Sequence, residues 1–201
     1  FDAHLQVVVA FRMLPKQVWN LPPFGTFNVH AALLPQYRGA APINWAVING
    51  ETETGVTTFF LDKDIDTGRI ILQKSFAIPD TADVEYVYNG LMHLGAKIAM
   101  DTIDLIASKL SEDNFDNVDF PAVLDSISAP QVSDKLELNH APKIFKETCE
   151  INWNQSAKKV YDFVRGLSPY PGTWSTLLPI DDNGEKPLVM KVYKTAKSDR
   201  P

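Results

Sequence analysis

Two polar residues, Asn28 and His30, stand two positions apart in the stretch "GTFNVHAALLPQYRGAAP", residues 25 to 42. Successive side chains of a strand point to opposite faces, so these two share one face while Phe27 and Val29 share the other. An amide can donate a hydrogen bond to an oxyanion, and an imidazole can handle a proton. The pair is therefore suited to acyl transfer, although a satisfied structural pair would look the same in the sequence.

The imidazole needs a third group to orient or charge it, and Asp66 in the turn "DIDTG" is the obvious candidate. Other chemistries lack their motifs, because the chain has no Gly-x-Ser-x-Gly elbow, no Gly-x-Gly-x-x-Gly and no P-loop. It also has no second histidine at a metal-ligand spacing from His30. We therefore expect no metal and no covalent nucleophile, which leaves direct transfer from a bound donor to an acceptor that supplies its own nucleophile.

These side chains would be positioned by a sheet. Short apolar runs rich in β-branched and aromatic residues predict strands, the first of them a buried strand of the parallel type. The predicted strands cover residues 5–11, 26–30, 55–61 and 69–78.

Two helices are predicted in the same part of the chain. Pro42 at a first helical position and Gly50 just past the end bracket a short one. Apolar residues recur at spacings of three and four between residues 83 and 109, which predicts a long helix with one buried face. The expected stripe is Val84, Val87, Tyr88, Leu91, Leu94, Ile98, Thr102 and Leu105.

Residues 111 to 142 lose this periodicity and are acidic and punctuated by Ser and Pro, which is typical of a connector and not of a core element. A second unit then begins near Ala141, with a helix that Gly166 ends and a hairpin over residues 168 to 196. The predicted organisation is an α/β domain at 1–115, a linker at 116–140 and a second domain at 141–201.

Charge and composition bound the partners and the compartment. The net charge is −6, but residues 1 to 134 carry 8 basic against 17 acidic side chains, while the remainder carries 11 against 8. A mildly basic tail is compatible with a polyanionic partner, and solvated charge explains it equally well. The lone Cys149 suits a reducing compartment, and the longest apolar run is too short for a membrane helix. We expect a cytoplasmic protein with no membrane partner.

Residues 27 to 72, "FNVHAALLPQYRGAAPINWAVINGETETGVTTFFLDKDIDTGRIIL", carry a resemblance. They resemble the signature region of the folate-dependent formyltransferases, where Asn-x-His-x-Ser-Leu-Leu-Pro-x-x-Arg-Gly-Ala-Ala-Pro precedes Glu-x-x-x-Gly and Asp-x-x-x-Asp-Thr-Gly. Residues 5 to 110 are closely similar, and "APKIF", "INW" and "LSPYPGTW" are similar to landmarks at the entry to the family's C-terminal domain. The resemblance implies a Rossmann-like domain, with its N-terminal half missing from this chain, followed by a partial OB-like β-barrel.

The same resemblance implies roles for residues. Asn28, His30 and Asp66 would be the catalytic trio, and 10-formyltetrahydrofolate would be the formyl donor. Ala32 stands where the family usually has Ser. Arg38 would either approach a substrate phosphate or anchor its loop. The donor pocket would be lined, largely through backbone groups, by Arg12, Met13, Leu14, Ala32, Leu33, Leu34, Pro35, Asp62, Lys63 and Asp64.

The branch of the family that this chain resembles most formylates the α-amine of initiator methionyl-tRNA for translation initiation. We expect the full-length protein to be a monomer, with tRNA contacts from basic residues after 140, such as Lys158, Lys159, Lys191 and Lys194. One alternative is a related enzyme that acts on a nucleotide sugar, on glycinamide ribonucleotide or, as a formyl-folate hydrolase, on water. Another is a non-catalytic fragment that only binds tRNA.

Overall fold

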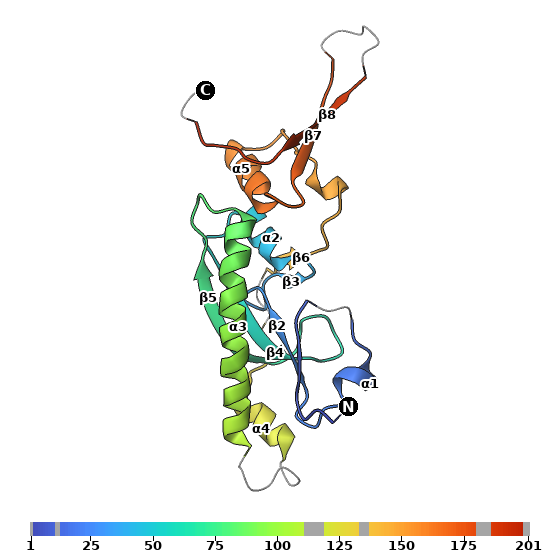
Figure 1. Ribbon diagram of the computed structural model, residues 1–201, viewed down its shortest axis with the longest axis vertical. Helices are drawn as coiled ribbons and strands as arrows, with labels where there is room; N and C mark the ends of the chain where they lie inside the picture. The colour runs from blue at the N-terminus through green and yellow to red at the C-terminus, as the bar shows by residue number, and fades with distance from the viewer. Residues whose placement is uncertain (1, 11–12, 111–118, 133–136, 180–185, 199–201) are drawn as a thin grey trace.

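A computed structural model describes residues 2–10, 13–110, 119–132, 137–179 and 186–198. Its central element is a four-stranded sheet in the order β1-β2-β4-β5 (Figure 1). These strands are Gln6–Val8, Thr26–His30, Glu53–Phe60 and Ile70–Ala77. β1 is parallel to β2, whereas β4 is antiparallel to both of its neighbours, β2 and β5. The first strand is thus shorter than predicted, and β2 has a parallel neighbour on one side only.

The long helix α3 (Val84–Lys109) runs along the sheet (Figure 1), and its predicted extent is confirmed. Asp83 caps it by accepting from the Tyr86 backbone N–H. Most of the predicted stripe is buried, but Tyr88 is exposed, because it lies to one side of the buried face to which Val87 and Leu91 belong. The Thr102 and Thr58 hydroxyls form a hydrogen bond of 2.8 Å between the helix and β4.

Two shorter helices lie in the first half of the chain. α1 (Lys16–Trp19) is a single turn, and α2 (Pro42–Ile48) begins at the proline as predicted. Gly50 follows α2 at a φ of +74°, the left-handed conformation that glycine adopts without a steric penalty after a helix. The start and stop signals of α2 therefore act as the sequence indicates.

The interpretation of residues 111 to 142 as free of core elements is wrong. α4 (Phe120–Ile127) is a helix whose capping residue Asp119 accepts from the Ala122 backbone N–H. Its apolar side chains pack on a core cluster that includes Phe24, Phe60 and Ile106. Farther along, β6 (His140–Ala141) pairs in parallel with β3 (Arg38–Gly39). The segment therefore contributes to the first domain, because apolar residues from both ends of α4 pack on that core.

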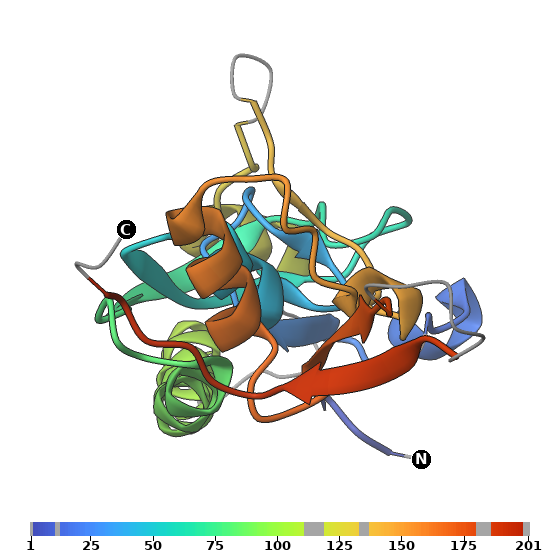
Figure 2. The same ribbon diagram turned by 90° about the horizontal axis from the view of Figure 1, so that it is seen from above.

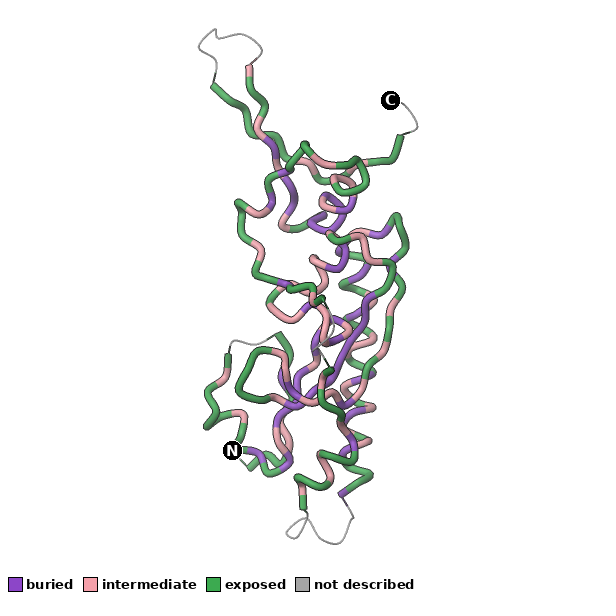
Figure 3. The backbone as a smooth tube through the Cα atoms, turned by 180° about the vertical axis from the view of Figure 1, so that it is seen from behind, coloured by how far each residue is buried: buried purple, intermediate pink, exposed green. Residues whose placement is uncertain are grey.

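The second unit holds the short 3-10 helix η2 (Glu147–Cys149), α5 (Ala157–Gly166) and the strands β7 (Thr173–Leu177) and β8 (Leu188–Val192). β7 and β8 form the predicted hairpin; its expected turn at residues 181 to 184 lies outside the described residues. Within the described part of the chain the sheets are open and no barrel closes. Figure 3 shows the hairpin as mostly exposed at its far end, whereas buried residues follow the central strands and one side of α3.

α5 joins the second unit to the first by lying against α2 (Figure 2). The Asn44 amide donates to the Gly166 carbonyl at 2.9 Å. A Cβ on Gly166 would lie 2.6 Å from Ile48 Cγ1, so the absence of a side chain there allows the close approach of the two helices.

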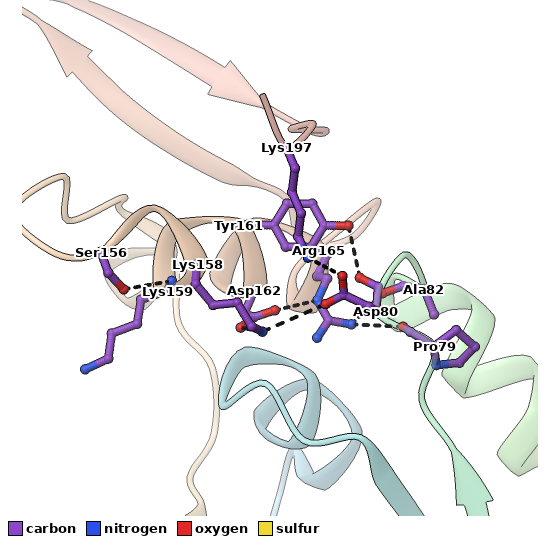
Figure 4. Close-up of polar contacts among 10 residues, drawn as sticks. All are labelled: Pro79, Asp80, Ala82, Ser156, Lys158, Lys159, Tyr161, Asp162, Arg165 and Lys197. Carbon is purple, nitrogen blue, oxygen red and sulfur yellow. Dashed lines mark hydrogen bonds and ion pairs between the residues drawn. The ribbon is translucent and has the colours of Figure 1, made fainter. Parts of the chain in front are cut away.

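Arg165 forms a buried ion pair within α5 and also fastens this helix to the turn that precedes α3 (Figure 4). Arg165 Nε donates to Asp162 Oδ1 at 2.8 Å, and Arg165 Nη1 donates to the Ala82 carbonyl at 2.9 Å. Lys158 donates to the other Asp162 oxygen at 2.6 Å. Because Asp162 and Arg165 are only 4% and 6% exposed, each depends on the other for compensation of its charge.

An exposed set of contacts surrounds this pair. Lys197 forms an ion pair with Asp80 and lies over the Tyr161 ring, with Nζ 5.0 Å from the centroid (Figure 4). The hydrogen bond from Lys197 lowers the pKa of Asp80. No helix among the described residues is long and apolar enough to cross a membrane.

Candidate active site

Asn28 and His30 lie on β2, at the centre of the sheet. Asn28 and His30 are 5% and 6% exposed, and they pair across the antiparallel ladder with Phe59 and Thr57 of β4. Within the described residues, the Asn28 side-chain oxygen is buried and has no hydrogen-bond partner. Since buried polar atoms are nearly always satisfied, this amide retains a hydrogen-bonding capacity that a bound group can use.

The two ring nitrogens of the His30 imidazole face different groups. Nε2 lies 2.9 Å from the backbone carbonyl oxygen of Tyr37, and a carbonyl can only accept, so Nε2 carries a proton. Nδ1 lies 3.8 Å from Asp66 Oδ2, which is longer than a direct hydrogen bond. The Phe59 ring meets the imidazole edge-on at 6.3 Å between centroids. The nitrogen free to gain or lose a proton is therefore Nδ1, on the side of Asp66.

Tyr37, which the sequence reasoning did not single out, sets the position of the carbonyl that holds His30. Its backbone is left-handed, at a φ of +59°, and its hydroxyl donates to Glu51 Oε1 at 2.5 Å. The Asn49 amide donates to the same hydroxyl at 3.1 Å. Burial, followed by the hydrogen bond to Glu51, raises the pKa of Tyr37 well above its usual value. Tyr37 is thus a neutral donor that ties its strained backbone to the end of α2.

Asp66 reaches His30 from the loop between β4 and β5. Its backbone is also left-handed, at a φ of +55°, and its side chain is 11% exposed. Asp66 Oδ2 accepts from the Gly39 backbone N–H at 2.9 Å. The structure therefore brings His30 and Asp66 together, and the Gly39 N–H fixes the carboxylate oxygen that faces the imidazole.

Arg38 acts as an anchor, as one of its two predicted roles requires. Its Nε and Nη2 donate to Gln131 Oε1 at 3.2 and 2.7 Å. The Gln131 amide in turn donates to the carbonyls of Asp66 and Gly68. Gln131 lies in the segment read as a connector, and no motif in the sequence marks it.

The loop after β2, predicted to line the donor pocket, is clamped by two side chains that sequence reasoning missed. Thr57 Oγ1 donates to the Ala32 carbonyl at 2.6 Å and accepts from the Leu34 backbone N–H at 3.1 Å. The Gln73 amide donates to the Leu34 carbonyl at 2.8 Å. Ala32 and Leu34 are buried, and Leu33 and Pro35 are half-buried. The backbone groups named here are therefore engaged within the protein, which makes the loop rigid.

The other residues predicted to bind the donor lie nearer the surface. Asp62, Lys63 and Asp64 are exposed, and Asp62 Oδ1 accepts from the Asp64 N–H and the Thr67 hydroxyl. Met13 is 76% exposed and Leu14 is half-buried. Arg12 lies outside the described residues. No group of three or more His, Cys, Asp or Glu side chains that could hold a metal is present in the described ranges.

Two family models match this chain. A family model described as "Formyl transferase" matches residues 1–103, and one described as "Formyl transferase, C-terminal domain" matches residues 143–200. The protein named methionyl-tRNA formyltransferase of Parabacteroides distasonis is 55% identical over 198 residues, 97% of this chain and 56% of that protein. Its namesake in Bacteroides fragilis is 54% identical over 197 residues, 98% of this chain and 56% of that protein. The chain thus spans little more than half the length of these relatives.

Solved structures share the fold at low sequence identity. A 4-N formyltransferase from Francisella tularensis has a TM-score of 0.66 at 20% identity. The match covers 96% of this chain and 72% of that protein's chain. HypX from Aquifex aeolicus, solved in complex with tetrahydrofolic acid, has a TM-score of 0.63 at 20% identity and covers 87% of this chain and 27% of its own.

Proposed function

The chain belongs to the formyl transferase family, and from this premise we propose that it transfers the formyl group of 10-formyltetrahydrofolate to the α-amine of initiator methionyl-tRNA. The names of the relatives that are 54 to 55% identical support this acceptor. The observation that carries the chemistry is the imidazole of His30, which is fixed by the Tyr37 carbonyl at one nitrogen and faces Asp66 with the other.

The residues present suit a formyl donor. A formyl oxygen needs an N–H donor at a buried position. Asn28 is buried beside His30 and its side-chain NH2 can be that donor, whereas its oxygen, which has no partner among the described residues, can only accept. We place 10-formyltetrahydrofolate between two loops. One is the clamped loop of Ala32, Leu33, Leu34 and Pro35, and the other is the loop of Asp62, Lys63 and Asp64. Met13 and Leu14 would complete this pocket. When bound, 10-formyltetrahydrofolate supplies the activated formyl carbon. The side chains of Asn28, His30 and Asp66 supply the hydrogen bonds and the proton transfer.

Each member of the trio has one task in this mechanism. Asn28 donates a hydrogen bond from its side-chain NH2 to the formyl oxygen as negative charge develops on it, and the His30 imidazole, once Nδ1 has gained a proton, stabilises that charge with its own positive charge. The α-amine forms a bond to the formyl carbon, the bond from that carbon to the folate N10 breaks, and N10 gains a proton while the amine loses one. Asp66 keeps the imidazole oriented and helps to move that proton at Nδ1, because Nε2–H is committed to Tyr37.

We further propose that residues 141–201 form part of an OB-like, tRNA-binding domain. Residues 116–140 join it to the catalytic domain at 1–115, and α4 in this connection packs on the core of the catalytic domain. Lys191 and Lys194 are exposed on and just after β8, where they are free to meet phosphates. Lys158 is less suited to this role, since it pairs with Asp162 and Asp80. A cytoplasmic monomer is the form in which we expect the full-length protein to act.

An assay of formyl acceptors with the full-length protein tests the function. We expect formyl transfer from labelled 10-formyltetrahydrofolate to initiator methionyl-tRNA, with rates at least a hundredfold lower for glycinamide ribonucleotide, an amino sugar nucleotide and water. Transfer chiefly to one of those three acceptors would overturn the proposed substrate. Binding of tRNA without any folate turnover would overturn the proposed catalysis.

A further inference from the structure

We propose that Gln131 is a positioning residue for Asp66: it holds the loop that carries the carboxylate at the distance from His30 that formyl transfer requires, a role that rests on the function proposed above. It touches no reacting group, so it acts entirely through Asp66 and Arg38.

The contacts of Gln131 use all of its amide. Nε2 donates to the Asp66 carbonyl at 2.8 Å and to the Gly68 carbonyl at 2.9 Å. Oε1 accepts two hydrogen bonds from the Arg38 guanidinium. One side chain therefore joins the β4–β5 loop to β3, two segments that are about thirty residues apart in the sequence.

These two segments are the ones that place the carboxylate. Asp66 is in the left-handed region, which disfavours residues with a side chain and needs surrounding contacts to persist. Gly39 follows Arg38 and donates its N–H to Asp66 Oδ2 at 2.9 Å. Gln131 thus restrains both ends of this hydrogen bond, the acceptor through the Asp66 carbonyl and the donor through Arg38.

Gln131 is itself held in place by backbone pairs on both sides. Ala129 exchanges two 2.8 Å hydrogen bonds with Ile70 at the start of β5. The Ala141 carbonyl accepts from the Ala40 N–H at 2.7 Å, beside the β3–β6 pair. The segment is therefore anchored two residues before Gln131 and again ten residues after it. These anchors fix the backbone that carries the Gln131 side chain.

Arg69 offers a matched control, because it ties the same connector to the same sheet without touching Asp66 or Gly39. Its Nε and Nη2 donate to the Ser128 hydroxyl and carbonyl at 2.9 and 2.8 Å. A role of Gln131 in simply attaching the connector would be shared by Arg69, whereas a role in placing Asp66 would not.

The experiment compares the steady-state kinetics of three variants of the full-length protein: Gln131→Ala, Gln131→Glu and Arg69→Ala. We expect Gln131→Ala to lower kcat by about ten- to a hundredfold, since misplacing a catalytic group by about 1 Å costs that much, with both KM values within about threefold. Gln131→Glu keeps the acceptor for Arg38 but loses the donors to the two carbonyls, so it should lower kcat as well. Arg69→Ala should leave kcat within about threefold of wild type.

Two readouts separate positioning from stability and from the proposed function. In an Asp66→Asn background, Gln131→Ala should cause no further loss of kcat, because residues that act as a unit are non-additive; a multiplicative loss would overturn the inference. Independently of activity, hydrogen exchange at the Gly39 amide should quicken at least tenfold in Gln131→Ala and not in Arg69→Ala. Unchanged exchange would overturn the inference even in an active enzyme, whereas an inactive wild type with the expected exchange would overturn only the function.

Discussion

At the scale of single residues, the site is organised around the tautomer of one histidine. The Tyr37 carbonyl commits His30 Nε2 to a donated hydrogen bond, so proton exchange is confined to Nδ1. The neighbouring Asn28 amide is buried on the same strand with an unused oxygen. Together these two side chains present a proton-handling group and an amide to the same position, as transfer of a formyl group to an amine requires.

We predict that Asn28→Ala and His30→Ala each lower kcat for formyl transfer by about two to four orders of magnitude, the range for oxyanion and acid–base groups. Both variants should keep the wild-type circular dichroism spectrum. His93→Ala is the control, because His93 is exposed on α3, and it should retain the wild-type rate. A wild-type rate in either site variant would remove that residue from the mechanism.

A second residue-scale prediction concerns pH. The pKa of Tyr37 is raised in the folded protein, chiefly by burial. Its phenol therefore stabilises the fold below its unfolded pKa of about 10, and this contribution is lost as the pH rises above that value. Between pH 7 and pH 11 the free energy of unfolding should fall more steeply in wild type than in Tyr37→Phe.

Urea denaturation at both pH values measures this difference. At pH 7 the Tyr37→Phe variant should be less stable by about 1 kcal/mol, because the hydrogen bond to Glu51 is lost. Parallel pH profiles for the two proteins would show that the Tyr37 hydroxyl does not couple to folding.

At the scale of elements, α5 docks through a charged pair and a missing side chain. Gly166 lets α5 approach α2, and Arg165 reaches across to the carbonyl of Ala82 at the start of α3. Burial of both Asp162 and Arg165 makes this contact specific, since an unpaired charge there would be costly.

We predict that Arg165→Ala lowers the free energy of unfolding by about 3 kcal/mol, the low end for a broken buried ion pair, since Lys158 still compensates Asp162. Lys159→Ala on the same helix removes an exposed side chain and should change stability by no more than about 0.5 kcal/mol. Chemical denaturation of the two variants gives both values, and equal effects would show that the pair does not hold α5.

At the scale of the whole molecule, acidic and basic residues are divided unequally between the two parts of the chain. The acidic first part carries the trio, while the hairpin β7–β8 projects from the far end of the molecule (Figure 1) and exposes Lys191. In the proposed function, one long substrate, the aminoacylated tRNA, contacts the hairpin through its phosphates and receives the formyl group on its amine at the sheet.

We predict that the double variant Lys191→Glu and Lys194→Glu weakens tRNA binding and reduces the slope of log affinity against log salt by about one for each lost phosphate contact. Filter binding between about 50 and 200 mM salt measures the slope. Lys97→Glu, which reverses the charge of an exposed side chain on α3, should leave the slope unchanged. A slope equal to that of wild type in the double variant would remove the hairpin from the tRNA interface.

The sequence by itself determined the features that depend on neighbours in the chain. α2 and α3 form where Pro42, Gly50 and the apolar spacing predict them, because caps and helical periodicity act within one or two turns. Asn28 and His30 share a strand face for the same reason, since alternation is a local property of the backbone.

The tertiary structure alone decided which distant groups meet. α4 packs on the core although its surroundings read as a connector, because burial there depends on Phe24 and Phe60, far away in the chain. The carbonyl that sets the His30 tautomer follows a left-handed turn at Tyr37, and Gln131 reaches the Asp66 loop across 65 residues. Hydrogen bonds between segments so widely separated leave no periodicity or motif, since each depends on where the whole chain places both partners.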